Sequence, residues 1–411
     1  MSRRLQSVPD VDVAIVGGSI VGATLAGLLA RAGLRVAIIE QAPPSQYNAE
    51  ADYELRVLAL TRATERILRA VGAWSQIEKG RLGHFRHMVV WDANGEGEIR
   101  FDAAQICEPT MGYIAELGLL QSALEKTLEA WPVVQWHRPA ALESMRPLDG
   151  QVEIMLSTGR RITARLLVGA DGANSRVRDL AGIKEQTHDY AQRAIVCSVR
   201  TEKPHEDTAW QRFLSTGPLA FLPLADPHVC SIVWSTSPDQ AQALLDMDES
   251  TFHSELQQSF DHRLGAVIET SRRLSFPLTR AHADNYVQPR LALVGDAAHR
   301  IHPLAGQGAN LGFLDAATLA EVIAEAHAAG KDIGSFKVLR RYERWRKGDN
   351  LAMMLTMDGF KHLFGSTLPP VRFLRNFGLS LTDAVTPVKN EIMRRAMGLA
   401  GDLPRVAQYS A

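Results

Sequence analysis

The chain has 411 residues, of which 46% are hydrophobic and 22% are charged, a composition typical of a globular protein with a sizeable core. Its 45 basic and 46 acidic side chains nearly cancel, so no overall field indicates a nucleic acid or another polyanion as partner. Three widely spaced cysteines form neither a metal motif nor a disulfide framework. No apolar run approaches the roughly 18 residues of a membrane span, and no apolar segment of signal-peptide length follows the first arginines. We therefore expect a cytoplasmic protein.

The N-terminal part of the chain predicts a strand, a glycine turn, a helix and a second strand. Residues 11–16 form a short apolar run, residues 20–32 are the small and apolar residues of a buried helix, and residues 35–40 form a second apolar run. A unit of this kind predicts two parallel strands joined by a crossover helix.

The turn in this unit has the spacing of a dinucleotide-binding fingerprint. Gly17 and Gly22 stand at the tight turn and at the helix–strand contact, while Ser19 takes the middle position, which is usually glycine. Serine is small enough to let the backbone approach a pyrophosphate. Glu40 follows at the end of the second strand, where a carboxylate accepts a hydrogen bond from a ribose hydroxyl. The pattern predicts an adenine dinucleotide, without separating FAD from NAD.

The middle of the chain changes from helices to strands. Alternating segments separated by glycine turns predict a β-meander over residues 133–168. Residues 187–285 are rich in Thr, Val, Phe and Trp and predict an antiparallel sheet with two helices, a module on the substrate side. Helical patterns occupy residues 63–71, 119–130, 316–329 and 335–359.

Two more glycine-containing segments follow apolar strands. Residues 169–178 (GADGANSRVR) follow the strand at 166–168, and residues 295–312 follow the strand at 290–294. Ligands of open α/β sheets bind at the carboxyl ends of strands. An Asp-Gly pair after a strand is most often an ordinary turn, and a glycine-rich segment before a helix is often only a cap. Two strand-end aspartates together with a glycine-dense helix start are harder to explain by structure alone.

These three segments resemble, in order, the dinucleotide fingerprint, the DG motif and the GD motif of p-hydroxybenzoate-hydroxylase-like FAD-dependent monooxygenases. The resemblance covers essentially the whole chain. Within that class, residues 55–61, 299–308 and 375–399 are most similar to the ubiquinone-biosynthesis hydroxylases. It implies an α/β fold: a Rossmann-like FAD-binding domain with a glutathione-reductase-like βαβ unit, an inserted antiparallel β-sheet substrate domain and a helical C-terminus. The expected boundaries are 1–75, 105–182 and 286–345 for the FAD-binding domain, 76–104 and 183–285 for the substrate domain, and 346–411 for the C-terminal helical segment.

The resemblance also implies roles for particular residues. Asp296 would hydrogen-bond the ribitol chain of FAD, and Asp171 and Arg176 would lie near the pyrophosphate and assist the reaction with NAD(P)H. Ala309 stands where the family often has a larger apolar residue, which would enlarge the space near the flavin. The implied cofactor-binding set is Gly17, Gly22, Glu40, Arg56, Gln121, Asp171, Arg176, Asp296, Gly306, Gln307, Gly308 and Asn310.

The implied chemistry belongs to the cofactor. NADH or NADPH would reduce FAD transiently, and the reduced flavin would add O2 to give a C4a-hydroperoxide that hydroxylates an aromatic ring. A helix beginning near Gly306 and Gln307 would aim its unpaired N–H groups at the flavin and stabilise its negative charge. His299 and Pro303 are the candidate catalytic residues, although a histidine in a cofactor loop is more often a packing or hydrogen-bonding residue. No metal-ligand spacing is present, so no metal is expected.

The favoured substrate is a polyprenylated phenol in ubiquinone biosynthesis. The alternatives are a flavin hydroxylase of a soluble aromatic, a flavin halogenase or ene-type reductase, and a non-catalytic flavoprotein scaffold. A halogenase is disfavoured because the chain has no WxWxIP-like segment.

The C-terminal segment 361–405 mixes apolar residues with seven basic and three acidic side chains. It forms either a helical lid packed on the core or a peripheral contact with anionic lipid of the inner membrane or with a partner protein. A lipophilic aromatic substrate makes membrane contact reasonable.

Overall fold

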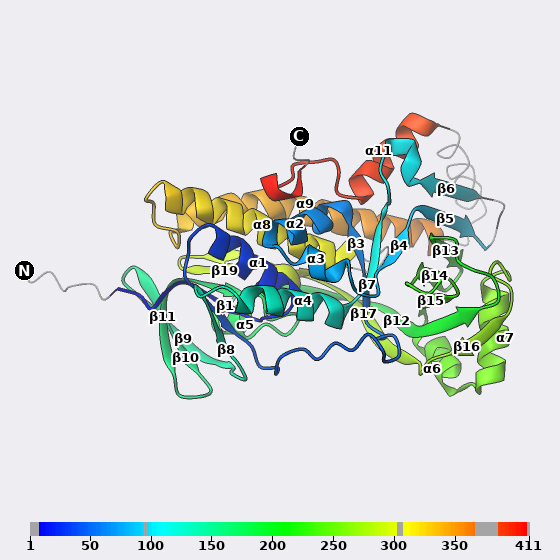
Figure 1. The fold of residues 1–411 in the computed structure, drawn as a ribbon, viewed down its shortest axis with the longest axis horizontal. Helices are drawn as coiled ribbons and strands as arrows, with labels where there is room; N and C mark the ends of the chain where they lie inside the picture. Colours follow the sequence, from blue (N-terminus) through cyan, green and yellow to red (C-terminus); the bar gives the residue numbers. More distant parts are fainter. Residues whose placement is uncertain (1–7, 94, 96, 302–306, 366–384, 409–411) are drawn as a thin grey trace, which may run out of the picture.

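The computed structural model of the protein describes residues 8–93, 95, 97–301, 307–365 and 385–408. Its two large sheets lie toward opposite ends of the long axis, and a small three-stranded sheet lies between them (Figure 1). The site described below lies where these three sheets meet.

The first sheet is mostly parallel. Its strands in spatial order are β18 (Val287–Gln288), β19 (Leu291–Leu293), β11 (Arg161–Gly169), β1 (Val11–Val16), β2 (Val36–Ile39) and β8 (Val134–His137). In this order every neighbouring pair is parallel except β18 and β19. The predicted strand–helix–strand unit is confirmed, and its strands are buried on both faces, as expected for a sheet covered on two sides.

The predicted meander over residues 133–168 is only partly right. Strands β9 (Leu142–Leu148) and β10 (Gln151–Leu156) do form it with β11. Strand β8, however, pairs in parallel with β2 at the far edge of the sheet. It follows helix α4 (Leu117–Glu129), and a strand that returns through a helix joins a sheet in the parallel direction.

Small residues let the helices of the first sheet pack closely. Helix α1 (Ile20–Arg31) is buried on nearly all sides and contacts α4, α2 (Arg62–Val71) and α8 (Gln307–Ala328). A Cβ at Gly27 would lie 2.7 Å from Val71, and a Cβ at Gly312 of α8 would lie 2.8 Å from Val21. The close α1–α8 contact brings the first turns of both helices to one cavity.

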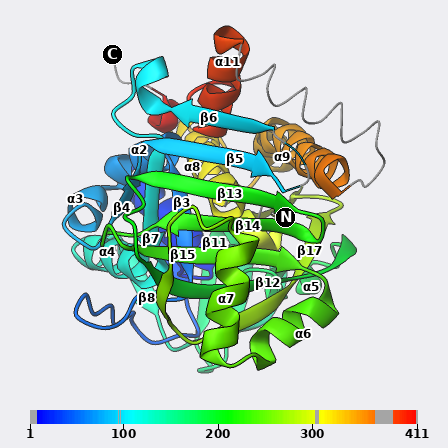
Figure 2. The same ribbon diagram turned by 90° about the vertical axis from the view of Figure 1, so that its right-hand side faces the viewer.

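The second sheet is antiparallel except where β13 and β5 pair in parallel. Helices α6 (Pro238–Asp246) and α7 (Glu249–Ser259) cover one face (Figure 2), with Trp234 and Phe252 in the shared core. Its strands in spatial order are β20 (His299–Arg300), β17 (Leu274–Ala283), β12 (Glu185–Thr201), β15 (Val229–Thr236), β14 (Gly217–Pro223), β13 (Thr208–Leu214), β5 (His87–Asp92) and β6 (Glu98–Asp102), with β16 (Val267–Thr270) beside β12. The predicted antiparallel sheet with two helices is confirmed.

Two helices and the small sheet connect these two parts. The small sheet contains β3 (Val57–Thr61), β7 (Gly112–Glu116) and β4 (Gly83–Phe85). Helix α9 (Phe336–Gly365) runs from β18 to β13 and β14, and its Asp358 binds Tyr190 and Arg280 of the second sheet. Helix α11 (Thr386–Ala396) lies beyond β6 and packs on η1 (Ala103–Ile106). The shorter elements are α3 (Trp74–Ile77), α5 (Arg176–Leu180), η2 (Gly295–Ala297) and η4 (Arg405–Ala407).

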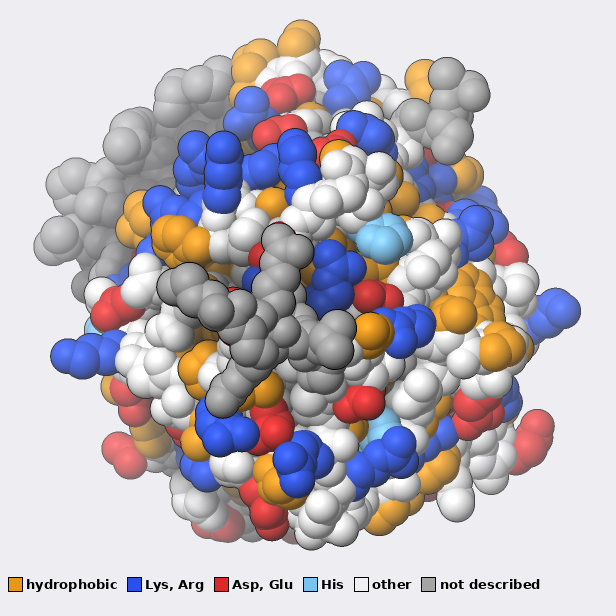
Figure 3. All heavy atoms as spheres, turned by 90° about the vertical axis from the view of Figure 1, so that its left-hand side faces the viewer, with side chains coloured by type: hydrophobic (Ala, Val, Ile, Leu, Met, Phe, Trp, Pro, Cys, Tyr) orange, Lys and Arg blue, Asp and Glu red, His pale blue; other side chains and the backbone are white. Residues whose placement is uncertain are grey.

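The surface carries both signs of charge. Figure 3 shows basic and acidic side chains interspersed over the face at the left of Figure 1, in keeping with a net charge of -1. Among the described residues, no helix is long and apolar enough to cross a membrane.

Candidate cofactor and substrate cavity

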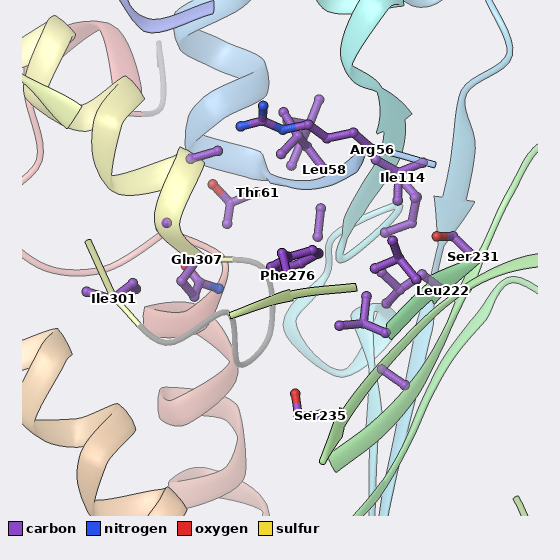
Figure 4. A pocket seen from close by; sticks show the side chains of 18 of the residues that line it. Arg56, Leu58, Thr61, Ile114, Leu222, Ser231, Ser235, Phe276, Ile301 and Gln307 are labelled. Carbon is purple, nitrogen blue, oxygen red and sulfur yellow. The ribbon is translucent and has the colours of Figure 1, made fainter. Parts of the chain in front are cut away.

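A cavity of about 870 Å³ lies between the first and second sheets. Its walls come from the turn after β1, from β3, from the segment after β19, from the start of α8 and from one face of the second sheet. Figure 4 shows Leu58 of β3, Gln307 of α8 and Leu222 of the second sheet around this cavity. Of the expected cofactor-binding residues, Arg56, Asp296, Gln307 and Gly308 line it. Residues far apart in the sequence therefore share one cavity of the size that ligands occupy.

The fingerprint turn depends on its glycines for a close approach of backbones. Gly17 has a φ of +100°, and an added Cβ would lie 2.3 Å from the carbonyl oxygen of Ala170. A Cβ at Gly22 would lie 1.9 Å from the carbonyl oxygen of Gly17. Both positions exclude a side chain, which keeps the first turn of α1 against the end of β11.

The N-terminus of α1 is open to an anion. Ser19 is the N-cap, but its side chain makes no capping bond, and no acidic residue lies in the first turn. The amide of Gln121 instead donates to Ser19 Oγ at 2.9 Å, and Gln121 is not among the residues that line the cavity. Unpaired helix amides bind phosphate groups, so this end of α1 fits the pyrophosphate of a dinucleotide. Gln121 orients Ser19 beside it.

The Glu40 carboxylate is held at the side of this turn. Its Oε2 accepts from the amide of Gly18 at 2.6 Å, and its Oε1 accepts from the amide of Ala42 at 2.8 Å. A carboxylate has about four lone-pair sites, so further acceptor capacity is left for a ribose hydroxyl. This geometry fits the expected role of Glu40.

The segment after β11 is fixed by Asp171. Its carboxylate accepts from Ser175 Oγ at 2.6 Å and from the amide of Val177 at 3.1 Å, which closes the turn before α5. Arg176 is exposed and donates to the carbonyl of Glu143. The structure thus places Asp171 as an organiser of the loop and directs Arg176 toward a neighbouring strand.

Sequence reasoning missed Arg178, the buried arginine of this segment. Its guanidinium donates to the carbonyls of Ala173 at 2.9 Å and Ala297 at 3.2 Å, and it pairs with Glu185 at 2.9 Å. Arg178 therefore joins the segment after β11 to the segment after β19. The only sequence signal was its spacing of three residues from the helix cap Ser175, which places the two side chains on one face of the turn.

Two charged groups reach the cavity without partners among the described residues. Asp296 and Arg56 are both exposed and line it, and neither side chain has an ion pair or hydrogen bond to another described residue. The described part of helix α8 begins at Gln307. Its first residues, Gln307, Gly308 and Ala309, line the cavity. These groups fit a cofactor with hydroxyls and phosphates. Pro303 and Gly306 lie outside the described residues.

His299 belongs to a buried ionic cluster and does not line the cavity. Its Nε2 lies 2.5 Å from Asp315 Oδ2, while Arg346 Nε and Asn350 Nδ2 donate to Asp315 Oδ1 at 2.9 and 3.1 Å. Burial alone would raise the pKa of Asp315, but His299 and Arg346 outweigh it and lower this pKa to about 2. These contacts are those of a packing and hydrogen-bonding histidine, the alternative to a catalytic role for His299.

Asn310 is also directed into protein. It is buried, its Oδ1 accepts from the amide of Thr61 at 3.0 Å and from Thr64 Oγ at 2.7 Å, and its Nδ2 donates to the carbonyl of Ala59 at 2.8 Å. These bonds fix α8 to β3, so Asn310 holds two walls of the cavity together without lining it. Among the described residues, no cluster of His, Cys, Asp or Glu could hold a metal ion.

Comparisons with known proteins agree with the motifs. The family described as FAD binding domain matches residues 10–348. The 3-demethoxyubiquinol 3-hydroxylase of Escherichia coli is 41% identical over 388 residues, which cover 94% of this chain and 98% of that protein. The mitochondrial ubiquinone biosynthesis monooxygenase of Xenopus tropicalis is 37% identical over 430 residues, covering 93% of this chain and 92% of that protein.

Solved structures show the same fold. The p-nitrophenol 4-monooxygenase of Pseudomonas putida aligns with a TM-score of 0.77 at 21% identity, covering 94% of this chain and 98% of that one. The predicted α/β FAD-binding fold and the predicted FAD cofactor are thereby confirmed. The chain belongs to the FAD-dependent monooxygenases and, within them, to the family of the ubiquinone-biosynthesis hydroxylases.

Proposed function

We propose that this protein is an FAD- and NAD(P)H-dependent hydroxylase of a polyprenylated phenol in ubiquinone biosynthesis. The observation that carries the proposal is the cavity, which joins the dinucleotide turn and Asp296 to a mostly apolar face of the second sheet. Relatives named for ubiquinone biosynthesis support the substrate class. We also propose the domain division expected from the sequence, with residues 1–75, 105–182 and 286–345 binding FAD and residues 76–104 and 183–285 binding substrate.

Residues of the proposed FAD-binding domain would hold the cofactor. The free amides of α1 would bind the pyrophosphate, Glu40 a ribose hydroxyl and Asp296 the ribitol chain, with Arg56 beside them. FAD, when bound, would supply the chemistry of hydride transfer from NADH or NADPH and of O2 activation for aromatic hydroxylation. The first turn of α8 would stabilise negative charge on the ring system. The mostly apolar sheet face would exclude water and hold the substrate ring against the ring system of the cofactor.

Replacing Asp296 with alanine is expected to weaken FAD binding at least tenfold, because a hydrogen bond from a hydroxyl to a carboxylate contributes roughly 1.5–3 kcal/mol. The measurement is the flavin content of the purified protein and its dissociation constant for FAD. Asp239→Ala, at an exposed position in α6 away from the cavity, is the control and should retain FAD. Equal FAD retention in both variants would contradict the assignment of Asp296.

The reaction itself is tested by NAD(P)H oxidation with candidate phenols. A prenylated phenol should stimulate oxidation and yield a hydroxylated product, and membranes of a strain lacking the protein should accumulate a quinone precursor. Stimulation by soluble aromatics alone would favour the alternative hydroxylase. Bound FAD with no stimulation of NAD(P)H oxidation by any phenol would favour the alternative of a non-catalytic flavoprotein scaffold.

Peripheral contact with an anionic membrane is part of this proposal. On α11, Val388 and Ile392 are 51% and 42% exposed, and Arg394 and Arg395 lie in its last turn. The opposite side buries Met393 against η1, and Met397 after the helix lines the cavity. Arg395 pairs with Glu391 on the exposed side, and the two exposed apolar side chains with Arg394 beside them are suited to the interface of an anionic bilayer.

The double substitution Val388→Glu and Ile392→Glu is expected to lower binding to phosphatidylglycerol vesicles at least tenfold, because each side chain loses more than about 1 kcal/mol of apolar transfer. Co-sedimentation measures it. Ile268→Glu changes an equally exposed apolar side chain on β16 and should leave vesicle binding unchanged. Binding that both variants retain would remove α11 from the proposed contact.

A further inference from the structure

The face of the second sheet toward the cavity carries isolated polar groups among apolar ones. On β15, Ser231, Val233 and Ser235 all line the cavity, because alternate residues of a strand point to one face. Ile232 and Trp234 point to the opposite face and join the core beneath α6 and α7. Figure 4 shows Ser231 beside Leu222 of β14, and Ser235 farther along the strand.

The two serines are buried residues whose hydroxyls have no hydrogen-bond partner among the described residues. Ser231 and Ser235 are 1% and 2% exposed, and neither hydroxyl has a hydrogen bond to another described residue. Gln211 of β13 also lines the cavity, is 8% exposed, and has a side-chain amide with no described partner. None of these polar atoms is fully shielded, in contrast to the hydroxyl of Ser198, so each is open to the cavity and can take a hydrogen bond from a ligand or an ordered water.

The strand register sets the spacing of these groups along the cavity wall. Gln211 pairs with Ala220, and Ala220 pairs with Val233, the residue between the two serines. Gln211 therefore lies level with the midpoint of the two serines, which are about 14 Å apart along the strand at roughly 3.4 Å per residue. The small side chain of Ala220 leaves room above the sheet for a flat ring.

We propose that Gln211, Ser231 and Ser235 form a polar floor that hydrogen-bonds the oxygen substituents of the substrate's aromatic head. The inference rests on the proposed function and deepens it, because it assigns to these three side chains the selection of rings that carry more than one oxygen. Gln211 meets one oxygen of the ring, and a serine hydroxyl meets another. A monophenol leaves at least one of these buried groups unpaired, whereas a hydroquinone satisfies more of them.

The test compares two probes, a hydroquinone with one prenyl group and the monophenol with the same prenyl group. Dissociation constants are read from the change in the flavin spectrum of the FAD-loaded protein, without turnover. The wild type should bind the hydroquinone about tenfold more tightly. Ser231→Ala, Ser235→Ala and Gln211→Leu are tested as single substitutions. Gln211→Leu should reduce the ratio to about two, and so should at least one of the two serine variants.

A matched control is available across the strand pair. Ser198 of β12 pairs with Ser231, and its hydroxyl is buried without a described partner, but it does not line the cavity. Ser198→Ala should leave the ratio at its wild-type value. Should Ser231→Ala or Ser235→Ala fail to fold, the cysteine variant at that position keeps the volume and removes most of the hydrogen bonding.

The outcomes separate this inference from the proposed function. A ratio that stays near ten in all three variants overturns the polar floor, and so does a wild type that does not discriminate the two probes. A wild type that discriminates them but hydroxylates neither contradicts the proposed reaction while the polar floor stands.

Discussion

Gly22→Ala is expected to abolish FAD retention and to lower the free energy of unfolding by roughly 3 kcal/mol. The new Cβ would lie 1.9 Å from the carbonyl oxygen of Gly17, and no rotamer of alanine relieves a contact made by Cβ. The turn would have to open, and α1 would move away from the end of β11. The unpaired amides of α1 would then no longer face the pyrophosphate.

Flavin content, together with urea unfolding of the cofactor-free protein, measures this effect. Gly348→Ala in α9 is the control, because a Cβ there meets nothing within 4 Å. In that helix alanine should stabilise the protein by about 0.5–1 kcal/mol and leave FAD bound. Gly17→Ala should behave like Gly22→Ala, since Gly17 combines a φ of +100° with a contact of 2.3 Å to Ala170. A yellow Gly22→Ala protein of wild-type stability would contradict the proposed packing.

Asp315→Ala is expected to cost about 3 kcal/mol of stability, because it removes the buried carboxylate that pairs with Arg346 and leaves that guanidinium only the half-exposed Asp349 as an ionic partner. Asp315 is fully buried and accepts from His299, Arg346, Asn350 and the amide of Gly295. The bond to Gly295 fixes the segment that carries Asp296. We therefore expect weakened FAD binding along with the lost stability, measured by flavin content and urea unfolding.

The pH dependence of this effect has a defined direction. The pKa of Asp315 is lowered from 3.8 to about 2, so its ionised form stabilises the folded state. That contribution is complete above about pH 4 and is lost as the pH falls toward 2, a change of about 2 kcal/mol. The difference in unfolding free energy between the wild type and Asp315→Asn should shrink by this amount between pH 4 and pH 2.

An exposed carboxylate provides the comparison. Asp239→Asn on α6 should change stability by less than about 0.5 kcal/mol at neutral pH. If the difference between the wild type and Asp315→Asn is the same at pH 4 and pH 2, the ion pairs of Asp315 do not stabilise the fold in the way inferred here.

The sequence by itself determined the backbone of the site. The turn from Gly17 to Gly22, the carboxylate of Glu40 and the strand ends before Asp171 and Asp296 were all predicted and lie where expected. These features are local, because a tight turn requires glycine and a buried strand requires an apolar run, whatever the rest of the chain does.

Only the tertiary structure decided where the side chains of these segments point. Arg176 and Arg178 are two residues apart, yet the first is exposed and the second joins two loops. His299 and Asn310 turn away from the cavity because their partners, Asp315 and Thr61, come from other elements. The parallel pairing of β8 and the polar floor on β13 and β15 likewise depend on long-range register. Buried polar groups go to the partners that satisfy them, and a sequence does not show which distant residues those will be.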